Sequence, residues 1–226
     1  MEARSAWGCL VNRSRDLVRE AATFGSAPRV RASSDAVVRW TVAHAQSARK
    51  HMRDPAGLRA ALARVPAACR LPEAEISALC AADHRPNYCQ LMLGALVAAA
   101  VPDTVAALRV NEDVRALSDA VGTLERLYRT PIPPSYTRNT GRLLALWWLF
   151  TPLALQSELG LWAILVAPAA TLVLGAIDTI GVELEEPGAI LPTALICDGI
   201  AAQAVEVALY AAKARELAAA TVEQGR

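Results

Sequence analysis

A long apolar block in the second half of the chain constrains the fold more than any other feature. The block runs from Leu143 to Ile177 and contains one charged residue, Glu158. As a single helix it would be about 52 Å long at about 1.5 Å per residue, well beyond the roughly 30 Å hydrocarbon core of a bilayer. A break within the polar stretch Gln156–Gly160 gives two helices that each fit a membrane. The sequence therefore predicts a transmembrane helical hairpin.

We expect this hairpin to span residues 136–182, with helices at about 136–155 and 161–182. Pro152 and Pro168 lie inside these two helices. A proline weakens a helix in water, but within a membrane neighbouring helices and ordered water can satisfy the carbonyls that it frees. The two prolines are therefore compatible with the predicted hairpin.

Two arginines mark the predicted membrane interface. Arg138 and Arg142 lie where the first helix would leave the bilayer. The long arginine side chain can extend its charge to the interface while its stem stays in apolar surroundings. Counted from Leu143, however, the first span is short. A soluble bundle with an apolar central hairpin therefore remains an alternative.

Charge is divided unevenly along the chain. Residues 1–142 contain 20 Lys and Arg against 13 Asp and Glu, whereas residues 143–226 contain 3 against 9. Basic residues near membrane helices favour the cytosolic side. We therefore expect the outer ends of the hairpin to face the cytosol, or the stroma in a plastid. The arginines are mixed with acidic residues, which does not indicate a nucleic-acid-binding surface.

The rest of the chain has the composition of helices. Ala, Leu, Arg and Glu dominate it, and runs of β-branched residues are short. We predict an all-α fold with a cytosolic helical region (1–135) and a C-terminal cytosolic segment and helix (183–226). A second helix is expected to begin at Ser34 or Asp35, after a loop. In the first helix, about 6–23, one narrow stripe is expected to face the core: Leu10, Ser14, Leu17 and Ala21.

The clearest periodic pattern lies between residues 110 and 128. Apolar residues recur there in alternating steps of four and three: Val110, Val114, Leu117, Val121, Leu124 and Tyr128. A pattern of this length fits an amphipathic helix in a bundle and does not by itself specify a coiled coil.

The sequence contains no motif of a metal site or an enzyme. The five cysteines form no CxxC pair, and His44, His51 and His84 lack HExxH or HxxxH spacing. A short acidic cluster is more typical of a solvated helix end than of a calcium site; it contains Asp178, Glu183, Glu185 and Glu186. We therefore predict no catalytic, cofactor-binding or metal-binding residues.

Four stretches, taken in order, resemble the bestrophin family of anion channels, in the branch found in bacteria, algae and plant plastids. They are WGCLVNRSRDLVRE (7–20), HRPNYCQLM (84–92), NEDVRALSDAVGTLERLYRTPIPPSYTRNTGRLLALWWLFTPLAL (111–155) and GAIDTIGVELEEPGAILPTALICDGIA (175–201). Because the four matches are collinear over most of the chain, the resemblance is specific.

The resemblance implies an integral membrane protein that assembles as a homopentamer around a central anion pore. Its permeant partners would be chloride or other small monovalent anions, with bicarbonate as a further candidate. The membrane would be a chloroplast thylakoid membrane or a plasma or inner membrane. No cofactor and no enzymatic activity are implied.

The family has a cytosolic pore constriction close to an Ile-Pro motif, so the resemblance implies Ile132 as its candidate, with Thr130 as the alternative. A ring of apolar side chains can gate a pore by dewetting and does not bind anions tightly. Pro131, Pro133 and Pro134 limit the backbone there and are candidate hinge residues.

The sequence also departs from the family pattern. The family's neck is formed by an earlier membrane helix that these 226 residues do not contain, so we expect the chain alone to conduct poorly. Gly188 stands where Phe is usual, and Pro134 where Leu is commoner. VELEEPGAILP carries too few acidic residues for a calcium clasp, so calcium gating is not expected. The rival hypothesis is a soluble or peripheral scaffold that binds partners through the 110–128 pattern.

Overall fold

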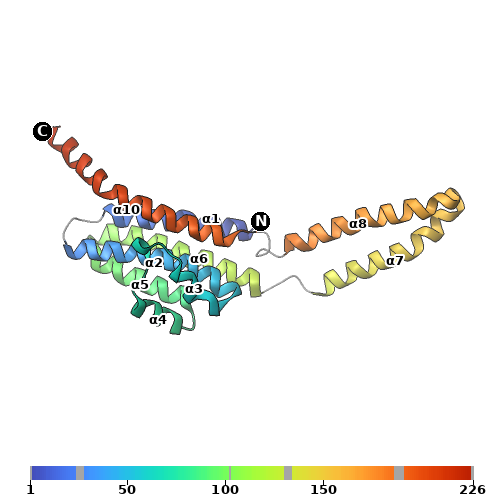
Figure 1. The fold of residues 1–226 in the computed structure, drawn as a ribbon, viewed down its shortest axis with the longest axis horizontal. Helices are drawn as coiled ribbons and strands as arrows, with labels where there is room; N and C mark the ends of the chain where they lie inside the picture. Colours follow the sequence, from blue (N-terminus) through green and yellow to red (C-terminus); the bar gives the residue numbers. More distant parts are fainter. Residues whose placement is uncertain (1, 24–27, 102, 130–133, 186–190, 225–226) are drawn as a thin grey trace. The chain divides into compact units, whose positions relative to one another are not determined.

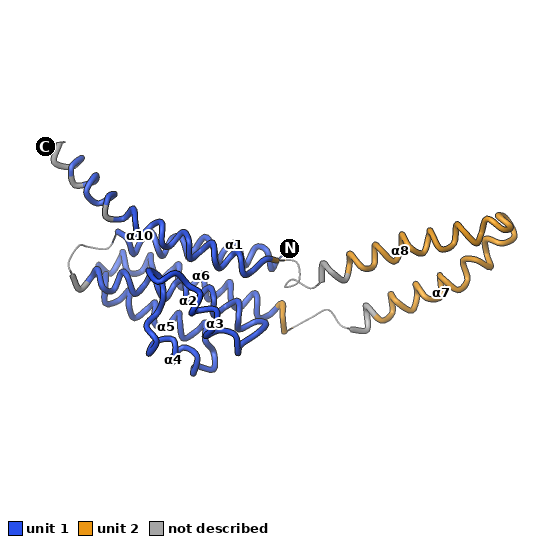
Figure 2. Tube along the Cα trace, viewed as in Figure 1, with its two compact units in different colours: residues 1–126, 192–226 blue, residues 127–191 orange. Residues whose placement is uncertain are grey.

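The computed structural model of the chain is built from helices (Figure 1). It describes residues 2–23, 28–101, 103–129, 134–185 and 191–224. Over these residues no strand occurs, which confirms the predicted all-α fold class. The chain divides into two compact units, which Figure 2 shows in different colours. Unit 1 comprises residues 1–126 and 192–226, and unit 2 comprises residues 127–191.

Unit 1 is a helical bundle in which the long helix α2 is central. This helix packs against α1, α5 and α10, and α1 also packs against α10. The elements of the bundle are α1 (Glu2–Thr23), α2 (Pro28–Arg53), η1 (Pro55–Gly57), α3 (Leu58–Ala63), η2 (Ala67–Cys69), α4 (Glu73–Ala81), α5 (Arg85–Ala100), α6 (Thr104–Arg129) and α10 (Thr193–Gln224).

The predicted core stripe of α1 is confirmed. All four of its residues are buried: Leu10, Ser14, Leu17 and Ala21. Next to this stripe, Val18 of α1 packs with Val42 of α2 and with Ala201 and Ala204 of α10. Burial of these apolar side chains away from water stabilises the bundle. The start and the end of unit 1 in the sequence therefore share one core.

The periodic pattern of residues 110–128 lies on α6 and also faces the bundle. Five of its six residues are buried, and Tyr128 is partly exposed. The buried residues are Val110, Val114, Leu117, Val121 and Leu124. The pattern is therefore that of an amphipathic bundle helix. Because its apolar face is already buried within the chain, it is not the free partner-binding surface that a scaffold would need.

The predicted start of the second helix at Ser34 or Asp35 is wrong. Helix α2 begins at Pro28, and both residues lie inside it. The fixed φ of proline suits the first turn of a helix, where its missing N–H is not needed. Ser34 is accommodated because its Oγ donates to the carbonyl of Val30, 2.9 Å away on the preceding turn. The side chain thus bonds within the helix rather than capping it.

Helix α5 begins at a histidine cap. His84 is the N-cap residue, and its Nδ1 accepts a hydrogen bond from the backbone N–H of Asn87 at 3.2 Å. Further along, Tyr88 forms an edge-to-face pair with Trp40 of α2, with ring centroids 5.8 Å apart. The contact face of α5 contains Cys89, Leu93 and Val97. These buried residues make α5 a helix of the bundle.

Unit 2 is a helical hairpin. Helix α7 (Pro134–Leu159) is followed by a short 3-10 turn, η3 (Gly160–Trp162), and by α8 (Ala163–Glu185). The chain reverses at Gly160, whose φ of +53° is strained for residues with a side chain. The sequence placed the break in Gln156–Gly160. In the structure α7 continues to Leu159, so the reversal falls at the last residue of that interval.

Candidate functional site

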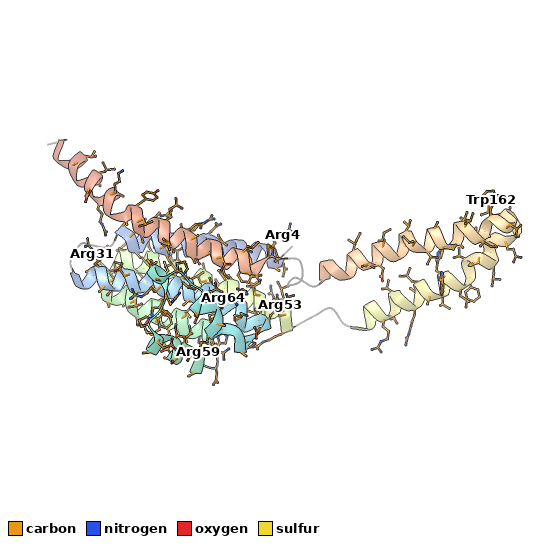
Figure 3. All side chains as sticks on the ribbon, in the orientation of Figure 1. Arg4, Arg31, Arg53, Arg59, Arg64 and Trp162 are labelled. Carbon is orange, nitrogen blue, oxygen red and sulfur yellow. The ribbon has the colours of Figure 1, made fainter. Side chains whose placement is uncertain are left out.

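The surface of unit 2 is apolar over most of its length. The exposed large side chains include Leu143, Leu146, Trp147, Trp148, Leu149, Phe150, Leu153, Leu161, Trp162, Ile164, Leu165, Leu172, Val173 and Ile177. Figure 3 shows the labelled Trp162 at the closed end of the hairpin, where it is 69% exposed. A continuous apolar surface of this kind is unfavourable in water and marks contact with lipid or protein.

The hairpin helices are long enough to cross a bilayer. With 26 and 23 residues, α7 and α8 would extend about 39 Å and 35 Å at about 1.5 Å per residue. The stretch Arg138–Gly181 has the length and composition of a membrane-crossing segment. Pro152 and Pro168 both lie inside helices, as expected. The exposed hairpin thus has the dimensions of a transmembrane element.

Polar groups inside the hairpin bond within their own helix. The hydroxyl of Thr151 donates to the carbonyl of Trp147, that of Thr171 to Ala167, and that of Thr179 to Gly175. Small residues allow two membrane helices to approach closely, and Ala163 and Ala167 are buried within unit 2. The three threonine hydroxyls thus have partners inside the protein, as polar groups in lipid require.

The two predicted interface arginines lie near the start of α7. Arg138 and Arg142 are both exposed and one helical turn apart. They precede the apolar surface that begins at Leu143. The two arginines therefore lie just before the apolar part of α7. Their contact with lipid headgroups stays a prediction.

The candidate pore and hinge residues are mostly outside the described residues. This holds for Thr130, Pro131, Ile132 and Pro133. Pro134 is the first residue of α7. The roles of these five residues stay predictions. Of the acidic cluster, Asp178, Glu183 and Glu185 lie in α8, and Glu186 is outside the described part of the chain.

A second stretch, Thr193–Ala218 of α10, also has the length and composition of a membrane span. Its first half contributes Cys197, Ile200, Ala201 and Ala204 to the buried core of unit 1. The thiol of Cys197 donates to the carbonyl of Ala45 in α2, 3.4 Å away. This part of α10 is therefore a bundle helix.

The structure brings together three residues that the sequence analysis did not group. His51 of α2, His84 at the start of α5 and Glu125 of α6 form one cluster. The Oε1 atom of Glu125 lies 3.0 Å from His51 Nε2 and 2.7 Å from His84 Nε2. The two imidazole rings are 4.7 Å apart between centroids. Because the residues come from three helices, no sequence spacing signals this cluster.

Comparison with known proteins gives a consistent result. A family model described as bacterial/fungal bestrophin protein matches residues 1–208. A voltage-dependent anion channel-forming protein of Nostoc is 34% identical over 91 residues, which are 40% of this chain and 30% of that protein. The chloroplastic voltage-dependent chloride channel 2 of Arabidopsis thaliana is 26% identical over 87% of this chain and 47% of its own length. The chain thus spans less than half the length of these two relatives.

The fold has a counterpart among solved structures. A bacterial bestrophin homologue from Klebsiella pneumoniae, carrying a single mutation, superposes with a TM-score of 0.82 at 24% identity. The superposition covers 92% of this chain and 77% of that one. The likeness establishes that the arrangement of helices in this chain is shared with that protein.

Proposed function

The chain belongs to the bacterial and fungal bestrophin family, and on that premise we propose that it is a subunit of a membrane channel that passes chloride down its gradient. The observation that carries the proposal is the family match over residues 1–208. The exposed apolar surface of the α7–α8 hairpin supports it, because a transport protein must sit in lipid. The activity proposed is passive transport and not catalysis.

A closed ring of copies is the assembly we propose, because one hairpin cannot enclose a pore. Identical subunits related by a rotation axis form such rings, and the resemblance to bestrophins favours five. In this ring each subunit contributes the same side chain at each level of the pore. Other small monovalent anions, bicarbonate among them, would share the path with chloride.

Ile132 is the residue we propose for the cytosolic constriction, with Thr130 as the alternative. Five isoleucine side chains would form an apolar ring that excludes water when narrow and does not hold anions tightly. Pro131, Pro133 and Pro134 restrict the backbone on either side of it. The prolines would thereby keep the ring at a defined diameter.

The charge distribution of unit 1 supports anion transport. Arg4, Arg31, Arg53, Arg59 and Arg64 are exposed on its surface (Figure 3). Basic residues on a surface raise the local concentration of anions and increase their rate of entry, an effect that salt weakens. Unit 1 contains 20 Lys and Arg against 17 Asp and Glu. The unit we place in the cytosol would thus attract the permeant ion.

The test is chloride flux from liposomes that contain the full-length protein as the cell produces it, because we expect these 226 residues by themselves to conduct poorly. We expect flux that depends on the chloride gradient and that exceeds potassium flux. Ile132→Ala widens the proposed ring and should raise chloride flux several-fold. Leu172→Ala, on the exposed surface of α8, is the matched control and should leave flux unchanged.

Three outcomes would count against the proposal or part of it. Liposomes with correctly inserted protein but no anion flux would rule out the channel function. Flux that Ile132→Ala leaves unchanged but Thr130→Val alters would move the constriction to Thr130. Equal permeation of potassium and chloride would remove the assignment of an anion-selective path.

A further inference from the structure

We propose that His51, His84 and Glu125 form a binding site for a divalent transition-metal ion, with zinc as its preferred occupant. Each residue offers one ligand atom, and the three atoms all lie within 4.8 Å of one another. The residues belong to three helices of unit 1, at the end of α2, the start of α5 and the last part of α6. This proposal does not depend on the proposed anion transport.

The donor atoms decide which metals fit. Two imidazole nitrogens and one carboxylate oxygen are a ligand set that zinc uses in proteins, with a water molecule at the fourth position. Imidazole also suits copper and nickel, whereas calcium and magnesium prefer oxygen ligands throughout. The site should therefore select zinc and its neighbours in the transition series over calcium and magnesium.

The observed distances are close to those a metal would impose. Ligand atoms about 2.0 Å from a tetrahedral zinc ion lie about 3.3 Å apart. The two contacts to Glu125 Oε1, at 2.7 and 3.0 Å, are somewhat shorter because they are hydrogen-bond distances. The side chains would have to separate by roughly half an ångström to admit the ion. The His84 side chain, which is 42% exposed, has the most room to move.

The proton on His84 can be placed from its cap contact. Because His84 Nδ1 accepts from the N–H of Asn87, a neutral His84 carries its proton on Nε2, which lies 2.7 Å from Glu125 Oε1. A metal bound at Nε2 requires that proton to move to Nδ1, so the cap of α5 is released. Metal binding thus replaces the hydrogen bond between His84 and Asn87 with coordination of the ion by three residues. An imidazole that is protonated must instead lose a proton, so metal affinity should fall in acid.

One of the cations next to the cluster in sequence, Arg85, is engaged elsewhere. Arg85 follows His84, and its guanidinium donates to the carbonyls of Pro55 and Cys80 at 2.6 and 3.4 Å. Its positive charge is thus partly compensated by main-chain oxygens.

An ion at the cluster would join α2, α5 and α6 one helical turn before α6 ends at Arg129.

Calorimetric titration of the metal-free, full-length chain in detergent with zinc chloride tests the proposal. We expect one zinc ion per chain and no binding of calcium or magnesium. His84→Asn removes the imidazole but keeps a residue that is favourable at an N-cap, and Glu125→Gln keeps the shape of the side chain. Each variant should weaken zinc binding at least about tenfold. Glu112→Gln, at an exposed position of the same helix, should bind as the wild type does.

Thiols are the competing zinc ligands, so a variant with both Cys9→Ser and Cys80→Ser is measured alongside; these two are the partly exposed cysteines. Wild-type affinity in this variant supports the histidine site. The proposal is overturned if the wild type binds no zinc, if both site variants bind it normally, or if only the cysteine variant loses it. Zinc should also raise the unfolding midpoint of the wild type but not of the site variants. Circular dichroism without zinc checks that the variants are folded.

Discussion

The guanidinium of Arg13 on α1 donates a hydrogen bond to the carboxylate of Asp113 on α6, with Nη1 and Oδ1 2.8 Å apart. The Asp113 side chain is only 8% exposed. Burial raises the pKa of this carboxyl, and the pairing with Arg13 opposes that rise. The same hydrogen bond raises the pKa of Arg13. A partly buried charge on α6 is thus stabilised by a cation from the first helix of the chain.

Arg13→Gln should therefore destabilise unit 1, and more so at neutral than at acid pH. At pH 7 the variant leaves a buried carboxylate without its cation, which should lower the unfolding midpoint by a few degrees. Because the pKa of Asp113 is raised, the folded state takes up its proton at a higher pH than the unfolded chain. The neutral acid needs no cation, so the loss should shrink at acid pH, where Asp113 takes up its proton.

Thermal unfolding in detergent, followed by circular dichroism at both pH values, checks this prediction. Arg4→Gln, at an exposed position of the same helix, is the control and should change little. A loss that is equal at both pH values would contradict the assigned pairing.

His44 should make the stability of unit 1 depend on pH. It is fully buried, and desolvation lowers its pKa from 6.5 to about 4. Between these values the unfolded chain binds a proton at this residue and the folded chain does not. Stability should thus be complete above about pH 6.5 and fall as the pH decreases towards 4, by roughly 3 kcal/mol in all.

Denaturant unfolding across this pH range measures the effect. His44→Gln removes the titrating group and should flatten the slope between pH 6.5 and 4, whatever it does to stability at pH 7. If the stability of the variant still falls with pH over this range, the pH dependence belongs to other titrating groups.

Gly160→Ala should destabilise the hairpin of unit 2. The backbone at Gly160 has a φ of +53°, and no atom lies within 4 Å of an added Cβ. The effect is therefore one of backbone conformation and not of crowding, and it should cost about 1 kcal/mol. Gly160→Asn should cost less, because asparagine tolerates this conformation better.

The matched control is Gly175→Ala, which also has open space around it but lies within α8. This change should be neutral or slightly stabilising, because alanine favours helices. Unfolding midpoints of the three variants in detergent provide the comparison. Equal effects at positions 160 and 175 would be inconsistent with the turn assigned to Gly160.

Brominated lipids should quench the tryptophans of the hairpin and spare those of the bundle. Trp147, Trp148 and Trp162 are 51, 62 and 69% exposed, whereas Trp7 and Trp40 are 3 and 1% exposed. If the hairpin lies in the bilayer, replacing its three tryptophans by phenylalanine should remove most of the quenching in liposomes. Quenching that remains after the triple replacement would place the bundle, and not the hairpin, in contact with lipid.

Local sequence patterns predicted much of the secondary structure. The Leu10–Ala21 stripe of α1 and the Val110–Leu124 pattern of α6 are buried, as their helical periodicity indicates. The start of α2 was missed because Ser34 and Asp35 have the side chains of N-cap residues. Serine and aspartate can also lie within a helix. Only the packing of the whole helix decides whether such a residue caps the helix or lies inside it.

The sequence by itself determined the all-α class and the apolar hairpin, and it limited the turn to Gln156–Gly160, because composition, periodicity and apolar runs are local properties. Tertiary structure decided which helices share a core and which charges meet. The pairing of Arg13 with Asp113 and the grouping of His51, His84 and Glu125 join residues far apart in the chain. Such contacts depend on how the helices pack against one another. The spacing of residues along the sequence does not indicate which side chains of α2, α5 and α6 will meet.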